Sequence, residues 1–149
     1  MDVFLVNTAG VYWYENGGGD DPTWAGPYTV DSSIVQTRYF YCGDVNGDEY
    51  PDVTVGTTPC DYNCGGLYYY QNSADSSTTI SFAKTTLVDD AGSAWHDAHI
   101  ADLNNDGHND IIGAAYWAQE IRVYLNDGST TPSWTSQTIG TSVVYPYGV

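Results

Sequence analysis

Nine residues in the C-terminal half, DLNNDGHND at 102–110, constrain the fold more than any other stretch of the chain. Carboxylate or amide side chains stand at the first, third, fifth and ninth positions of this stretch. These residues are Asp102, Asn104, Asp106 and Asp110. Alternating oxygens in a tightly curled loop suit Ca²⁺, which takes six to eight oxygen ligands at about 2.3–2.6 Å. A glycine at the sixth position permits the sharp bend, so the pattern predicts a calcium loop.

The loop begins as an EF-hand loop does, but an EF-hand needs a bidentate Glu at position twelve and a helix on each side. Ile112 and Gly113 stand where that glutamate would be. The flanking segments IIGAA and IRVYLND are short, apolar and β-branched, which is typical of strands. We therefore expect the loop to join two strands, with Asp110 closing the coordination.

The acidic pattern occurs twice, because DVNGDEYPD at 44–52 carries the same oxygens 58 residues earlier. Three further segments, GVYWYENG, GLYYYQNS and EIRVYLND, align on a shared tyrosine, and an aromatic residue follows each of them. Four short strands per 40–60 residues are typical of a propeller blade. We expect these repeated aromatic residues to pack between blades. They are Tyr14, Tyr70, Tyr124, Trp24, Phe82 and Trp134.

Two stretches, WHDAHIADLNNDGHNDIIGAAYWAQEIRVYLNDG and YCGDVNGDEYPDVTVG, resemble the FG-GAP/VCBS repeats of integrin-like β-propellers. The resemblance runs through nearly the whole chain and implies an all-β fold of four-stranded antiparallel blades. It implies that each acidic loop joins the innermost strand of a blade to the second strand and binds Ca²⁺. The implied ligands, with Tyr50 and His108 acting through their carbonyl groups, are Asp44, Asn46, Asp48, Tyr50, Asp52, Asp102, Asn104, Asp106, His108 and Asp110.

The first loop departs from the family pattern at its sixth position, where Glu49 replaces the expected glycine. A non-glycine residue in the left-handed conformation costs about 1 kcal/mol. We therefore expect the first calcium site to be weaker or differently bent than the second.

The phase of the repeat divides the chain into about three blades' worth of strands. Residues 1–31 are expected to form the outer three strands of a blade, 32–90 and 91–140 two complete blades with one calcium loop each, and 141–149 the innermost strand of a further blade. Propellers commonly have four to eight blades, so about three cannot close a ring alone. Further blades of a longer chain, or other copies of this chain, are the expected partners. Copies would form a ring or a filament.

The formal charge of −16 constrains the partners further. Phosphate backbones and anionic membranes would be repelled, so we expect no nucleic-acid binding. No run of eighteen apolar residues is present, so membrane insertion is not expected either. Two bound calcium ions would add four positive charges and bring −16 to about −12.

Three cysteines bear on the cellular compartment. Cys60 and Cys64 flank a turn and are candidates for a small disulfide loop, with free thiols as the alternative, and whether Cys42 is free stays open. A zinc site would need two more ligands nearby. A possible disulfide, few lysines and the calcium pattern favour an extracellular setting, either secreted or on the cell surface.

The sequence carries no GxSxG motif, Cys–His pairing signature or phosphate-binding glycine loop, so no enzymatic activity is expected. Tyrosine and tryptophan side chains stack well on sugars and on partner proteins. Four of them keep no fixed identity from repeat to repeat and are candidates for an exposed ligand surface. They are Trp13, Trp95, Tyr116 and Trp117.

These patterns favour a non-enzymatic, extracellular, calcium-binding propeller module for adhesion, recognition or structural assembly. The alternative is a carbohydrate-binding, lectin-like propeller, similar to integrin-like fungal lectins. A third interpretation is the scaffold domain of a polysaccharide-active enzyme.

Overall fold

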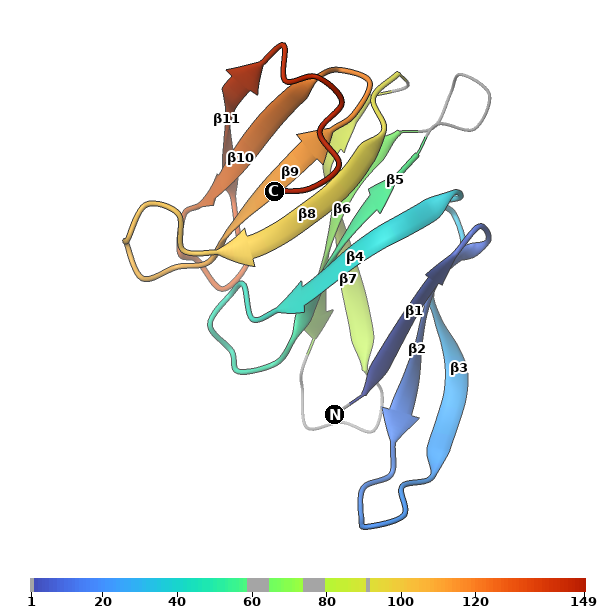
Figure 1. The fold of residues 1–149 in the computed structure, drawn as a ribbon. Helices are drawn as coiled ribbons and strands as arrows, with labels where there is room; N and C mark the ends of the chain where they lie inside the picture. Colours follow the sequence, from blue (N-terminus) through green and yellow to red (C-terminus); the bar gives the residue numbers. More distant parts are fainter. Residues whose placement is uncertain (1, 59–64, 74–79, 91) are drawn as a thin grey trace.

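Three separate antiparallel sheets make up the protein in a computed structural model (Figure 1). The structure describes residues 2–58, 65–73, 80–90 and 92–149, and this part of the chain contains strands but no α-helix. The first sheet consists of β1 (Val3–Asn7), β2 (Gly10–Asn16) and β3 (Trp24–Asp31). The second consists of β4 (Thr37–Gly43), β5 (Asp52–Thr57), β6 (Gly66–Ser73) and β7 (Ser81–Asp89). The third consists of β8 (Trp95–Ala101), β9 (Asp110–Ala115), β10 (Glu120–Asn126) and β11 (Trp134–Thr141).

Each sheet is a simple meander in which neighbours in sequence are also neighbours in space. The order is β4-β5-β6-β7 in the second sheet and β8-β9-β10-β11 in the third, and the first sheet has β1-β2-β3. This confirms the predicted all-β fold of four-stranded, propeller-like blades. Among the described residues, no helix has the length and apolar character needed to cross a lipid bilayer.

The strand register repeats from sheet to sheet. Tyr14 lies opposite Val3, Tyr70 opposite Val53, and Tyr124 opposite Ile111. Residues on paired strands that lie opposite each other point to the same side of a sheet, so the three tyrosines occupy equivalent places. The equivalence allows any residue of one sheet to be compared with its counterparts in the others.

Two apolar cores fill the spaces between the sheets. The core between the first and second sheets includes Val11, Val53 and Tyr70, while that between the second and third includes Leu67 and Trp95. Burial of such side chains is the main stabilising contribution to the stacking of blades.

Two of the repeated aromatic residues cross these spaces as predicted. Phe82 meets Phe4 of the first sheet edge-on with ring centroids 5.5 Å apart, and Trp134 meets Tyr69 of the second sheet at 5.3 Å. Trp24 occupies the equivalent place on the first sheet, since it lies opposite Asn16 as Phe82 lies opposite Asn72. It is 50% exposed, so the prediction of inter-blade packing is wrong for this residue. The physical reason is that no described strand covers that side of the first sheet.

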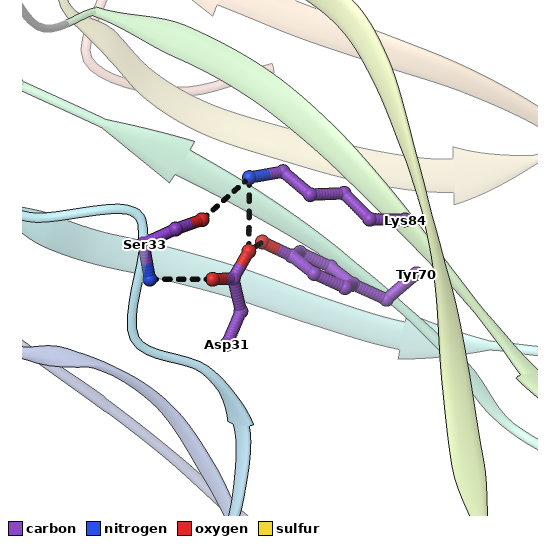
Figure 2. A network of polar contacts seen from close by, with 4 residues as sticks. All are labelled: Asp31, Ser33, Tyr70 and Lys84. Carbon is purple, nitrogen blue, oxygen red and sulfur yellow. Dashed lines mark hydrogen bonds and ion pairs between the residues drawn. The ribbon is translucent and has the colours of Figure 1, made fainter.

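A polar clamp joins the first sheet to the second (Figure 2). The Asp31 carboxylate accepts hydrogen bonds from the Tyr70 hydroxyl at 2.8 Å and the Ser33 backbone N–H at 2.6 Å, and lies 2.9 Å from the Lys84 ammonium. Burial alone would raise the pKa of Asp31, but these hydrogen bonds outweigh it and hold the pKa well below its usual range. The clamp therefore favours the ionised carboxylate.

Residues 142–149 form no strand and lie in front of the third sheet (Figure 1). The Val149 N–H donates to Asp97 Oδ2 at 3.2 Å, and the Tyr147 hydroxyl lies 3.4 Å from that of Tyr116. The sequence predicts an innermost strand here, but residues 142–149 pair with no described strand of the structure.

The predicted disulfide cannot be compared with the structure, because Cys60 and Cys64 lie outside the described residues. Cys42 is a half-buried free thiol on β4. Burial raises its pKa to about 11, so the thiol stays protonated and unreactive near neutral pH.

Candidate metal-binding loops

Both acidic stretches form loops at the same place in their sheets. The first loop (44–52) connects β4 to β5 and the second loop (102–110) connects β8 to β9. Each loop thus leads from the first strand of its sheet into the second, as the resemblance implies.

The first loop is curled around its own side chains. Asp44 accepts backbone N–H groups on both carboxylate oxygens, from Gly47 at 2.7 Å and from Glu49 at 2.9 Å. The Asp48 N–H donates to Asp44 Oδ1 at 3.1 Å and to Asn46 Oδ1 at 3.2 Å. The Asn46 Nδ2 group lies 2.8 Å from Asp48 Oδ2. The side chains at positions one, three and five therefore gather on one side of the loop.

The second loop repeats this arrangement. The Asp106 N–H donates to Asp102 Oδ1 at 3.2 Å and to Asn104 Oδ1 at 2.9 Å, and Asn104 Nδ2 lies 2.8 Å from Asp106 Oδ2. The Gly107 N–H donates to Asp102 Oδ2 at 3.0 Å. The backbone N–H of His108 also donates to Asp106, and this bond is the main cause of the lowered pKa of that carboxyl. Two stretches far apart in sequence have thus reached the same geometry.

Left-handed backbone occurs at positions four and six in both loops. The φ angles are 77° at Gly47 and 60° at Asn105, then 71° at Glu49 and 89° at Gly107. Asparagine tolerates this conformation better than most residues, whereas glutamate pays the full steric cost of it. Glu49 thus adopts the left-handed conformation of the glycine that it replaces, and the weaker first calcium site stays a prediction.

The ninth residue of the first loop, Asp52, is buried and accepts three hydrogen bonds from the protein. Asp52 Oδ2 accepts the Val45 N–H at 3.1 Å and the Tyr69 hydroxyl at 2.7 Å, while Oδ1 accepts the Asn72 N–H at 2.8 Å. Burial raises the pKa of Asp52, and the hydrogen bonds offset only part of this effect. The residue fastens the start of the loop to the third strand of its sheet.

An aspartate at the same position forms equivalent hydrogen bonds in the other sheets. Asp110 is buried and accepts the N–H groups of Leu103 at 3.0 Å and Asn126 at 2.9 Å. In the first sheet, Asp2 accepts the Asn16 N–H at 3.1 Å. This pairing was not predicted from the sequence, although an asparagine stands two residues after each aligned tyrosine. These asparagines are Asn16, Asn72 and Asn126.

The donors present in each loop fit a hard cation. Positions one, three and five offer two carboxylates and one amide oxygen, and Ca²⁺ prefers such oxygen ligands. In the described part of the chain, no three His, Cys, Asp or Glu side chains lie close enough to bind one metal ion by themselves. Amide and carbonyl oxygens would therefore be needed as well, the latter at Tyr50 and His108. The oxygens of Asp52 and Asp110 retain lone pairs beyond those used by the protein.

The surroundings of the two loops differ. The first loop is covered by the second loop and the third sheet, because Asn109 Nδ2 of the second loop donates to the Asp44 carbonyl at 2.6 Å and Asn126 Nδ2 of β10 donates to the Val45 carbonyl at 2.9 Å. Val45 is 2% exposed, whereas Leu103, at the same position of the second loop, is 39% exposed. The first loop is thus part of an interface between sheets, and the second faces outward.

The predicted aromatic ligand surface is half wrong. Trp13 and Trp95 lie buried in the structure, because Trp95 is part of the core between the second and third sheets and Trp13 packs on Tyr28 with ring centroids 4.9 Å apart. Trp117 is exposed and Tyr116 half-buried at the turn between β9 and β10. Tyr116 stacks on His96 with ring centroids 4.6 Å apart and on Tyr145 at 5.0 Å.

Comparison with known proteins gives one result. A family model of FG-GAP-like repeats matches residues 44–113, from the start of the first loop to the strand that follows the second. Searches of curated proteins and of solved structures found no match. Residues 44–113 are therefore an FG-GAP-like repeat segment, which confirms the family resemblance seen in the sequence.

Proposed function

We propose that the chain is a calcium-binding, non-enzymatic β-propeller segment that acts outside the cell in recognition, adhesion or assembly. The observation that carries the proposal is the matched geometry of the two loops. In both, the side chains at positions one, three and five gather on the same side of a backbone with left-handed residues at positions four and six. Such repeated convergence of oxygens suits a cation.

Bound calcium would supply positive charge among converging carboxylates. Asp44 and Asp48 would hold it in the first loop, and Asp102 and Asp106 in the second, with the intervening asparagines and the carbonyl groups at position seven. These side chains already accept hydrogen bonds that fix the loop backbone. Because the same side chains would hold both the ion and the loop backbone, a structural role for calcium is favoured over a catalytic one. An extracellular setting would provide the millimolar calcium that weak sites of about 10⁻⁴–10⁻³ M require.

Thermal unfolding with and without calcium tests the proposal. We expect the melting temperature to rise in millimolar CaCl₂, to fall in EDTA, and to respond much less to MgCl₂, which demands a stricter octahedral geometry. A double variant, Asp44→Ala with Asp102→Ala, should lose the response. The matched control, Asp20→Ala with Asp21→Ala, removes the same charge from an exposed turn and should keep it. An unchanged melting temperature in the wild type would rule out the calcium sites.

Carbohydrate binding is the second candidate, favoured by a group of partly exposed aromatic rings. Trp117 lies 5.0 Å from Tyr116 and 6.5 Å from Tyr145, measured between ring centroids. Exposed aromatic faces stack on sugars, and the charge of −16 favours neutral glycans. Binding on a glycan array that Trp117→Ala abolishes and Trp24→Ala leaves intact would support this candidate. An array without signal would contradict it.

A further inference from the structure

The outer face of the first sheet, which points away from the second sheet, resembles a buried surface. Val3 is 46% exposed and Leu5 42% exposed on β1. Their counterparts by register in the second sheet, Val53 and Val55, are both 0% exposed. The half-buried Tyr12 and Tyr14 of the outer face correspond in the same way to the buried Tyr68 and Tyr70. The first sheet thus presents to solvent the side chains that the second sheet buries against its neighbour.

Trp24 extends this uncovered face. Its counterparts Phe82 and Trp134 each pack on the sheet that precedes their own. Trp24 keeps the same place in the strand register but is exposed. Large apolar side chains exposed together on one face of a sheet are typical of an interaction site.

The outer face of the third sheet presents the complementary side of the same kind of interface. The last strand of each sheet contains one bulge residue, and its burial can be compared between the three sheets. Val30 and Leu87 pack into the cores between the sheets, whereas their counterpart Ile139 is 56% exposed. Leu103 repeats the contrast, because its counterpart Val45 is buried against the third sheet.

The edge of the first sheet is also unpaired. β4 pairs with β5 and β8 with β9, but no described strand pairs with β1 on that side. Unpaired backbone groups on such an edge accept an added strand. The sequence of residues 142–149 aligns with the start of β8, and the shared register would place Val149 opposite Val3 and Tyr147 opposite Leu5.

We infer that the outer face of the third sheet in one copy docks on the outer face of the first sheet in a second copy. Residues 142–149 of the first copy add to the β1 edge of the second. The two interfaces inside the chain have this same order of faces, so the contact between copies continues an interface that the chain already contains. The contact is heterologous and extends into a ring or a filament. This inference rests on the assembly role proposed above and identifies the partner as a second copy of the chain.

Charge opposes this association, since every copy carries a formal charge of −16. Repulsion between exposed charges is largely screened beyond about 8 Å at physiological ionic strength. The association therefore strengthens with added salt and with calcium.

Two variants that each damage one face test the inference by sedimentation velocity over a range of protein concentrations. The wild type should form species of twice the monomer mass and larger as concentration rises. Leu5→Asp and Ile139→Asp should each be monomeric alone, whereas an equimolar mixture should form a one-to-one dimer, because each variant retains one intact face. The matched control Val35→Asp, at an exposed residue between β3 and β4, should associate as the wild type does.

A wild type that stays monomeric at all concentrations and salt levels would overturn the inference. Failure of the mixed variants to dimerise, with near-ultraviolet circular dichroism matching the wild type, would overturn it too. The calcium-dependent melting temperature is measured on monomeric Leu5→Asp. A calcium shift in a protein that never associates contradicts only the docking, whereas association without a calcium shift contradicts only the metal sites.

Discussion

The first and second loops share their hydrogen bonds but differ in what lies against them. In both, the residue at position five donates its N–H to the side chains at positions one and three. The first loop is covered by Asn109 of the second loop and Asn126 of the third sheet, while the second loop is more exposed. The loop geometry is therefore local, and a neighbouring blade is needed only for its burial. Substitutions within the loops therefore distinguish the stability that comes from a loop's own hydrogen bonds from the stability that comes from its burial by a neighbouring blade.

The largest difference is expected at position nine, where the two aspartates have unequal numbers of partners. Asp52→Ala would leave two buried N–H groups and the Tyr69 hydroxyl without an acceptor, at a cost of about 3–5 kcal/mol. Asp110→Ala would orphan two N–H groups, at a cost of about 2–4 kcal/mol. Urea unfolding in EDTA measures both, with Asp21→Ala, in an exposed turn, as control. Equal losses would contradict the role of the tyrosine.

The clamp between the first two sheets is expected to matter next. Asp31→Asn should cost about 1–2 kcal/mol at pH 7, because charge-assisted bonds are lost but Lys84 is partly exposed. The lowered pKa of Asp31 means that its contribution is present above the unfolded-state value of about 4 and is lost as the pH falls below it. Unfolding free energies of both proteins should converge in acid. A constant difference down to low pH would argue against the clamp.

Calcium should stabilise both loops, and the second loop more than the first. Ligand at ten times the dissociation constant contributes about 1.4 kcal/mol per site through mass action. Asp44→Ala and Asp102→Ala should each remove part of the melting-temperature shift, with the larger loss for Asp102→Ala, because Glu49 weakens the first site. Differential scanning fluorimetry in a calcium series distinguishes the two. A larger loss for Asp44→Ala would reverse the predicted order.

The smallest effect concerns the left-handed residue at position six. Glu49→Gly should stabilise the protein by about 1 kcal/mol, because glycine adopts this conformation without steric cost. Gly107→Glu should destabilise it by about 1 kcal/mol through the backbone alone, since nothing lies within 4 Å of the added Cβ. Chemical denaturation in EDTA measures both. Changes of the same sign would contradict the equivalence of the loops.

Sequence alone predicted the features that local patterns specify. The paired loops, the short strands and the strain at Glu49 follow from residues within a few positions of one another. The inward role of Asp52 and the burial of Trp95 depend on strands distant in the chain, so single-residue patterns could not predict them. Trp24 shows the same limit, because an aromatic residue at a repeated position is buried only where a neighbouring sheet covers it.

Isothermal titration with calcium tests the central claim most directly. The account predicts two ions bound per wild-type chain, one for Asp44→Ala, one for Asp102→Ala, and none for the double variant. Each single loss would show that one loop still binds calcium when the other has lost its first ligand, although Asn109 of the second loop bonds to Asp44 of the first. Absence of binding to the wild type, or binding that survives in the double variant, would contradict the assignment of calcium to these loops.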